Sequence, residues 1–328
     1  MLEDDGDVLV LAPIPKPTSS TLLEIQAALE AGHDDWESVG VPAGDIGLEC
    51  DRQIWLSFRR ASPGERIDWQ KRRIFERGNI EEERLIDLLR LVGCEVWGQQ
   101  DRVRAAGGHL RGKIDGRALG IVEAPKTEHI VECKSAKQEV FREVKKKGVK
   151  VGKPDHYATF QFYMFGLGVD RVYYMMSNKN DEDLHLERVE YDAAFAIRAV
   201  ARIERIINMP EPPMRLCKKR DDFRGRFCRQ AAVCWGEEMP RAHCRTCIHS
   251  TPLMTGNAAW DCARWHQPLS LDEQAEGCPA HLYLPSLLVG LEMISADSEA
   301  ETITYRLPSG KIWVDGAAND NEEGEAAW

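Results

Sequence analysis

Between Trp69 and Ile207 the chain alternates predicted helices with short apolar strands, and this alternation restricts the fold more than any other feature. Apolar residues at helical spacing predict helices over 69–92, 140–147, 157–167 and 191–207. Apolar runs between glycines and prolines predict strands at 94–97, 110–114, 120–123, 130–133 and 171–177. Because such alternation builds layered cores, we expect an α/β fold with a central sheet flanked by helices.

Other segments surround this core. We expect a flexible lead-in over 1–18 and an N-terminal helical segment with Cys50 over 19–68, before a core over 69–209. Pro210, Pro212 and Pro213 mark the end of the core. The remaining chain divides into three parts: a cysteine-bearing segment over 210–239, a small Cys-rich module over 240–291, and a hairpin with an acidic tail over 292–328.

The composition indicates a globular protein that works inside a cell. Of its 328 residues, 43% are hydrophobic and 30% are charged. No run is long enough to cross a membrane, and the early apolar stretch 8–13 is too short for a signal peptide. Ten cysteines in an intracellular chain favour metal or cluster ligation over disulfides.

The net charge of −11 argues against a protein that binds nucleic acid over its whole surface. Charge is uneven, however, with basic segments at 59–73, 134–153 and 218–229. A local basic track beside an acidic site remains compatible with this composition.

The strongest chemical signal is an ordered set of acids and a lysine. Gly112-Lys-Ile-Asp115-Gly116 is followed by an apolar strand that ends in Glu132-Cys-Lys134. Since residues i and i+2 of a strand share a face, Glu132 and Lys134 project together and Cys133 points to the opposite layer. Asp115, at the end of a neighbouring strand, would lie beside them. Two such carboxylates suit Mg²⁺ or Mn²⁺, and the lysine can orient water or stabilise charge on a phosphate.

Glu-x-Lys by itself is a weak signal. Glu143-Val-Lys145 repeats it in a polar helix, and a second Asp-Gly occurs at 315–316. The set of Asp115, Glu132 and Lys134 differs from these copies in its order along the chain, because a helix that carries Gln161 follows it. Structural ion pairing is the alternative explanation.

This order of residues resembles the P-D-(D/E)-x-K nuclease superfamily, in particular its RecB/AddB-like branch, which includes the iron–sulfur exonucleases of CRISPR adaptation. Phage recombination exonucleases share the layout. The resemblance implies a restriction-endonuclease-like core with a mixed sheet and a Mg²⁺- or Mn²⁺-dependent DNA exonuclease for end processing or recombination. It implies Gln161, and either Tyr157 or Tyr163, near the site, while Thr159 stands where many phage members carry another glutamine.

The same resemblance places an acid on an upstream helix, four residues after a glycine. Glu82 stands at that distance from Gly78. Helical geometry puts Glu82 on the face that carries Leu85 and Leu89, where a buried acid needs a partner such as a metal. Glu81 also lies on an apolar side, and a solvated run of glutamates is the alternative.

Cysteines on both sides of the core form the second signal. In the iron–sulfur branch one cysteine before the core joins three after it to hold a [4Fe–4S] cluster, which implies Cys50, Cys217, Cys228 and Cys234. The gap between Cys217 and Cys228 is wider than in the family. Four thiolates suit zinc as well. Either site would join the N-terminal segment to the chain that leaves the core.

The remaining cysteines of the C-terminal half have zinc-like spacing: Cys244-x2-Cys247-x14-Cys262-x15-Cys278. His281 is an alternative last ligand. A Zn²⁺ ion here would be structural, stabilising a module too small to bury its own core. Buried free thiols are the alternative. Cys94 and Cys133 lie in apolar strands and are predicted core residues.

Basic residues flank the acidic set and predict contacts with DNA phosphates. The predicted DNA-binding residues are Arg72, Arg73, Lys145, Lys146, Lys147, Lys150 and Tyr157. No base-reading motif is visible, so binding would be independent of sequence, and a single-strand annealing protein is a plausible partner by resemblance. A cytoplasmic location follows, in a bacterial host cell if the gene is phage-encoded. Two alternative functions stay open: a DNA-binding scaffold whose nuclease site is vestigial, and a nuclease that acts on RNA.

Overall fold

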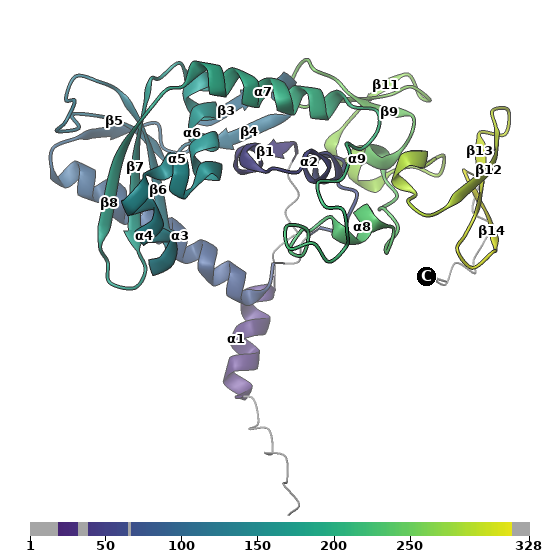
Figure 1. The fold of residues 1–328 in the computed structure, drawn as a ribbon, viewed down its shortest axis with the longest axis horizontal. Coiled ribbons are helices and arrows are strands. Elements are labelled where there is room, and N and C mark those ends of the chain that lie inside the picture. The colour runs from purple at the N-terminus through teal and green to yellow at the C-terminus, as the bar shows by residue number, and fades with distance from the viewer. Residues whose placement is uncertain (1–18, 32–38, 65–66, 317–328) are drawn as a thin grey trace, which may run out of the picture.

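The computed structural model describes residues 19–31, 39–64 and 67–316. The expected lead-in and acidic tail lie outside these ranges. The largest sheet has the strand order β2–β5–β6–β7–β8, in which β6 and β7 are parallel and the other pairs antiparallel. Its strands are β2 (Glu95–Trp97), β5 (Gly116–Leu119), β6 (His129–Ala136), β7 (Arg171–Asn178) and β8 (Leu184–Glu190) (Figure 1). This mixed sheet with flanking helices confirms the α/β fold.

The helices fall close to their predicted ranges. The N-terminal half contains α1 (Ser20–Glu30), η1 (Ala43–Gly47), α2 (Asp51–Phe58), α3 (Trp69–Leu91) and η2 (Ala106–Gly108). The rest are α4 (Gln138–Lys147), α5 (Val149–Gly152), α6 (Pro154–Leu167), α7 (Ala193–Asn208), α8 (Ala231–Trp235), η3 (Cys244–Thr246), α9 (Leu271–Glu276) and η4 (Pro285–Leu287). None of these described helices combines the length and the apolar character needed to cross a membrane.

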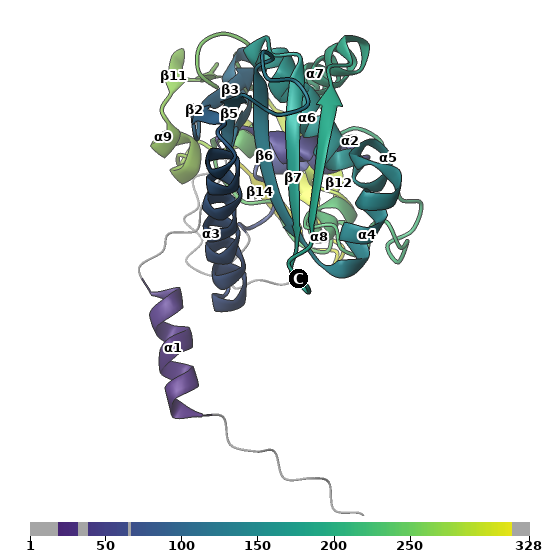
Figure 2. The ribbon, with the colours of Figure 1, turned by 90° about the vertical axis from the view of Figure 1, so that its left-hand side faces the viewer.

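Helices α3 and α6 cover opposite faces of the sheet. Figure 2 shows α3 running alongside the strands of the sheet. On its side, Leu85 packs with Val131 and Cys133 of β6, whereas Ile130 of β6 packs with Phe160 of α6 in the other layer. A central parallel strand buried on both faces needs a nearly continuous apolar run, which explains why β6 was predictable.

The strand predicted at 120–123 was wrong, and strand β8 was missed. The segment 120–123 is not a strand: Gly120 has φ +92°, Val122 is exposed, and the chain turns where Ala124 N–H donates to the Ile121 carbonyl (2.9 Å). The partner of β6 is instead β5, immediately after Asp115. Strand β8 was not predicted because, as an edge strand, it exposes Leu184 and Leu186 and half-buries the polar His185 and Glu187, so its sequence lacks the usual apolar-in, polar-out pattern.

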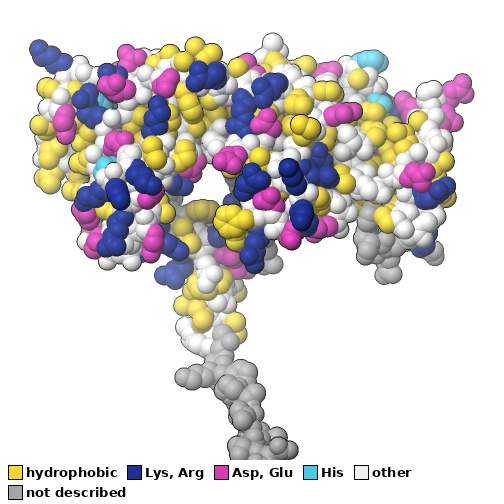
Figure 3. All heavy atoms as spheres, viewed as in Figure 1, with side chains coloured by type: hydrophobic (Ala, Val, Ile, Leu, Met, Phe, Trp, Pro, Cys, Tyr) yellow, Lys and Arg dark blue, Asp and Glu magenta, His cyan; other side chains and the backbone are white. Residues whose placement is uncertain are grey.

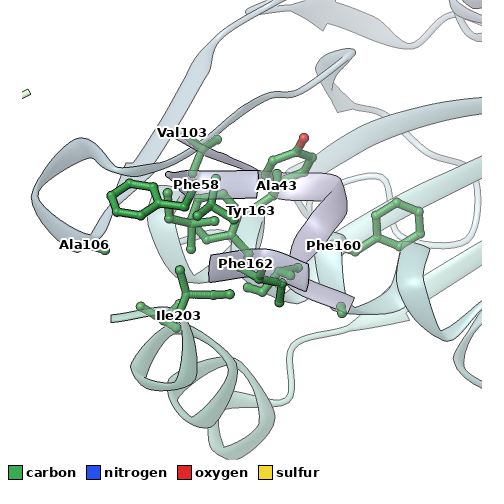
Figure 4. Close-up of a cluster of buried hydrophobic side chains, with 14 of the residues drawn as sticks. Ala43, Phe58, Val103, Ala106, Phe160, Phe162, Tyr163 and Ile203 are labelled. Carbon is green, nitrogen blue, oxygen red and sulfur yellow. The ribbon is translucent and has the colours of Figure 1, made fainter. Parts of the chain in front are cut away.

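A second sheet lies beside the first and orders its strands β1–β4–β3. These strands are β1 (Val41–Pro42), β3 (Arg102–Ala105) and β4 (Leu110–Lys113). Figure 4 shows Phe58 of α2, Val103 of β3 and Tyr163 of α6 converging in the buried cluster beneath it. The N-terminal segment and the core therefore share one hydrophobic interior.

Two small sheets follow the core. One consists of β9 (Ser250–Pro252), β10 (Trp260–Cys262) and β11 (Gln267–Leu269), and the other of β12 (Glu292–Asp297), β13 (Thr302–Arg306) and β14 (Ile312–Asp315). The β13–β14 pair confirms the predicted hairpin. The terminal sheet lies at the opposite end of the molecule from β8 (Figure 1).

The Cys-rich module packs directly on α2 through a buried arginine. Arg245 is fully buried, and its guanidinium donates to the Phe58 carbonyl (3.1 Å), the Val39 carbonyl (2.8 Å) and Gln274 Oε1 (2.8 Å). Trp260 of the module stacks on Phe58 with ring centroids 5.2 Å apart. Because each acceptor is satisfied, this contact fixes the module against the N-terminal segment.

Replacing Arg245 by methionine should lower the free energy of unfolding by about 3–5 kcal/mol, since buried acceptors lose their donors. Urea unfolding followed by tryptophan fluorescence measures the loss. The exposed Arg306, which pairs with Glu292 on the surface (3.1 Å), provides the control. Arg306→Met should change the stability by less than about 0.5 kcal/mol. Equal midpoints for the two variants would contradict the role of Arg245.

Candidate active site

Three predicted residues meet where β5 and β6 begin to pair. Gly116 is in register with Val131, so Asp115 stands next to Glu132 on the neighbouring strand. Glu132 and Lys134 alternate with Val131 and Cys133, and therefore point away from α3 toward the layer of α6. Sheet register thus brings together residues that are separated in the sequence.

The distances define a compact acid–lysine set. Lys134 Nζ lies 3.0 Å from Glu132 Oε2 and 3.4 Å from Asp115 Oδ2, and it donates to the Cys133 carbonyl at 3.0 Å. The Cys133 backbone N–H donates to Asp115 Oδ2 at 2.7 Å, which fixes the orientation of that carboxylate. Glu132 is only 2% exposed.

Burial and mutual charge shape the protonation of this set. Burial raises the pKa of Glu132, and the neighbouring Asp115 carboxylate raises it further. For Lys134 burial alone would lower the pKa, but the carboxylates of Glu132 and Asp115 outweigh it and raise the pKa. The ammonium group is therefore retained because it neutralises two crowded carboxylates.

Glu82 approaches the same site from α3. Its Oε1 accepts a hydrogen bond from Gln100 Nε2 (3.0 Å), and its pKa is raised by burial and then by the Asp115 charge. Glu81 instead pairs with Arg84 on the surface (3.0 Å). Both helix acids line the cleft that contains Lys134, and the Asp115 charge acts on Glu82.

The donor set fits a hard divalent cation. Glu132 Oε1 is buried and, among the described residues, has no hydrogen-bond partner, although a buried carboxylate oxygen needs a cation or a donor. In the described conformation Lys134 Nζ lies between the two carboxylates. Within the described ranges, no three or more His, Cys, Asp or Glu side chains are grouped closely enough to hold a metal ion. Carboxylate oxygens are the ligands that Mg²⁺ and Mn²⁺ prefer.

Of the predicted site residues on α6, one faces the acids and the others pack elsewhere in the fold. Tyr163 faces the acids: burial raises its pKa, and the Glu132 charge adds to the effect. The structure does not bring Gln161 to the site, because its Nε2 donates to the Glu190 carbonyl (2.9 Å) and its Oε1 accepts from Asp192 N–H (2.7 Å). These bonds hold the end of β8 and the start of α7. Tyr157 packs against Phe195, away from the acids.

Sequence analysis did not select Lys179, which lies just past β7. It lines a cleft of about 390 Å³ together with Glu82 and Lys134, and with Ile74 and Phe75 of α3. A lone lysine after a predicted strand carries no distinguishing pattern. Only the three-dimensional fold places it here.

The first cysteine set converges in space. Cys50, at the N-cap of α2, lines a cavity of about 40 Å³ with Cys217, Cys228 and Cys234. Burial raises the pKa of Cys228, and the charges of the other three thiols raise it further. Four cysteines from both ends of the core thus share one small cavity.

The second set converges around another cavity, of about 290 Å³, lined by Cys244, Cys247, Cys262 and Cys278. Burial raises the pKa of Cys244 to about 12, with further contributions from the other three thiols. His281 does not line this cavity; its ring lies against Tyr283. Cys94 and Cys133 are buried in the core under α3, as predicted.

Most of the predicted DNA-binding lysines have acidic partners. Lys145 pairs with Asp183 (2.5 Å), Lys147 with Glu143 (2.5 Å) and Lys150 with Asp192 (3.5 Å). Lys146 is exposed on α4, and Arg72 and Arg73 lie in the first turns of α3. Surface pairs of this kind are weak and leave the lysines able to exchange partners.

Comparisons with known proteins provide only distant likenesses. No protein-family model and no curated protein sequence matches the chain. Among solved structures it is similar to an alkaline exonuclease from Laribacter hongkongensis (14% identity, 56% of this chain and 90% of that chain covered, TM-score 0.39), and to the same exonuclease in complex with dAMP (12%, 56% and 90%, 0.37). It is also similar to the protein SSO0001 (13% identity, 65% and 95% covered, TM-score 0.38).

Proposed function

We propose that this protein is a divalent-metal-dependent DNA exonuclease of the P-D-(D/E)-x-K type. The supporting observation is the buried set in which Lys134 Nζ lies 3.0 Å from Glu132 and 3.4 Å from Asp115. Two carboxylates and one ammonium group on adjacent inner strands of the sheet provide both the cation ligands and the positive charge that phosphodiester hydrolysis requires.

Asp115, Glu132 and Glu82 would hold the cation, Mg²⁺ or Mn²⁺, which supplies activation of water and neutralisation of phosphate charge. The Cys133 amide orients Asp115, and Gln100 orients Glu82. Lys134 keeps its proton and places a positive charge where negative charge grows on the scissile phosphate. Tyr163 closes the α6 side of the site.

A local basic surface is compatible with an acidic protein that acts on DNA. On the face shown in Figure 3, lysine and arginine side chains gather on both sides of an opening through the molecule, interleaved with acidic ones. Arg72, Arg73, Lys145, Lys146, Lys147, Lys150 and Tyr157 remain proposed DNA contacts. Action in phage-type recombination, with a single-strand annealing protein as partner, belongs to the same proposal.

The cysteines provide two structural centres in this proposal. Cys50, Cys217, Cys228 and Cys234 would hold a [4Fe–4S] cluster, because four converging thiolates from distant parts of the chain match its ligand set. Cys244, Cys247, Cys262 and Cys278 would hold Zn²⁺, with Cys278 rather than His281 as the last ligand. Both centres stabilise the fold and take no part in the chemistry.

Cleavage assays with and without divalent cations test the function. Linear single-stranded, linear double-stranded and circular DNA are incubated with the protein in Mn²⁺, Mg²⁺ or EDTA. We expect mononucleotides or short fragments from the linear forms with either cation, and none in EDTA. Intact linear DNA in Mn²⁺ would indicate a scaffold with a vestigial site, and cleavage of circular DNA would assign an endonuclease instead.

A further inference from the structure

Strands β3 and β4 carry an unusual pairing of like charges. Arg102 lies directly opposite Lys113, and Arg104 directly opposite Arg111. Directly opposed residues of an antiparallel pair share a face, and residues two apart along each strand share it as well. All four cations therefore project from one side of this ribbon.

This arrangement is unfavourable for the protein alone. Like charges directly opposite each other destabilise a strand pair. The repulsion affects Arg111: burial lowers the pKa of its guanidinium, and the charges of Arg104 and Arg102 lower that pKa further. The nearest acid in the sequence, Asp101, pairs with Arg117 (3.5 Å), and within the described ranges no ion pair involves Arg102, Arg104 or Lys113.

One of the four side chains is held rigidly. Arg111 donates from Nε and Nη2 to the Gly108 carbonyl (3.0 and 2.7 Å) and from Nη2 to Asn257 Oδ1 (3.3 Å). Arg102, Arg104 and Lys113 are exposed around it. The ribbon thus combines a fixed guanidinium with three adjustable cations.

A groove runs along these cations and includes Tyr163, which faces the acidic site. A cavity of about 610 Å³ is lined by Arg102, Arg104, Arg111, Lys113 and Tyr163, with Pro42 among its apolar residues. Tyr163 also lies within electrostatic reach of Glu132, and Lys113 precedes Asp115 by two residues. The groove therefore shares Tyr163 with the surroundings of the acids.

We propose that this groove binds the phosphodiester backbone of the DNA strand that enters the site, with Arg102, Arg104, Arg111 and Lys113 contacting its phosphates. A polyanion relieves the repulsion among four neighbouring cations, whereas a single small anion neutralises only part of it. The apolar wall around Pro42 suits the bases or sugars of a single strand. The inference rests on the proposed nuclease function and names the strand path for it.

The test measures the salt dependence of binding. Fluorescence anisotropy of a labelled single-stranded DNA oligonucleotide is recorded in EDTA at several salt concentrations, for wild type and for the double variant Arg102→Gln, Arg104→Gln. Each lost phosphate contact should reduce the slope of log affinity against log salt by about 0.7, so the double variant should lose about 1.4.

Two variants control the result. Arg306→Gln with Lys311→Gln removes the same charge from the exposed terminal sheet and should keep the wild-type slope. Arg102→Lys with Arg104→Lys keeps the charge and should also keep it. An unchanged slope for the glutamine pair, in a protein that binds and cleaves DNA, would overturn the groove alone. A wild type that neither binds nor cleaves DNA would overturn the proposed function.

Discussion

Replacing Lys134 by methionine is expected to lower the single-turnover cleavage rate of linear DNA in Mn²⁺ by about 10²–10³-fold, the usual effect of removing one charge-stabilising group. Methionine retains most of the length and volume of lysine but removes the ammonium group beside Glu132 and Asp115. The lost interaction is one that strengthens as charge grows on the phosphate, so the rate should fall more than the affinity for DNA.

The chain supplies its own control for this substitution. Glu143-Val-Lys145 repeats the Glu-x-Lys pattern on the exposed helix α4. Lys145→Met removes the same group from the same local sequence. As a proposed phosphate contact, Lys145 should affect DNA affinity, but its loss should leave the single-turnover rate at saturating DNA within about twofold. A Lys134→Met protein that unfolds in urea like wild type and cleaves at the wild-type rate would contradict the assignment of Lys134.

The second large effect concerns the four cysteines around the small cavity. If the proposed cluster is present, replacing Cys50 by serine should remove it, with loss of the broad visible absorption of an iron–sulfur cluster and of the iron content. Cys50 and Cys217 close a very long loop, and by the usual loop-closure relation a link over that length is worth about 5 kcal/mol. The free energy of unfolding should therefore fall by a similar amount. Anaerobic purification with metal analysis and urea unfolding measures both.

Cys94 provides the matched control, because it is a buried core thiol that does not line the cavity. Cys94→Ala should keep the absorption and the metal content. A colourless wild-type protein with zinc in this site would refute the cluster while keeping the four-cysteine link. A Cys50→Ser protein with the metal content and stability of wild type would refute both.

The central strand and its acids were predictable because local pattern and burial agree there. Strand β6 buries the apolar Ile130 on one face and Val131 on the other, and its alternation sends Glu132 and Lys134 to one layer and Cys133 to the other. Helix α3 was similarly regular, although Leu88, which has the helical spacing of Leu85, is exposed. Patterns with period two or 3.6 carry this information in the sequence.

Other features depend on register and could not be predicted. The strand after Asp115 was placed a few residues too late, since glycine at 116 and 120 gives no local sign of which residues pair with β6. Gln161 was assigned to the site by resemblance, but its amide bonds the end of β8 instead. The facing pair of Arg104 and Arg111 becomes visible only once β3 and β4 are aligned.

The most direct test of the account is the release of nucleotides from end-labelled linear DNA by wild type and by Asp115→Asn, side by side in Mn²⁺. Asparagine keeps an oxygen that can accept from the Cys133 amide but removes the charge that a cation ligand supplies. We expect release of nucleotides by wild type and none above background by the variant. Equal release by both proteins, or none by wild type, would contradict a nuclease centre at Asp115, Glu132 and Lys134.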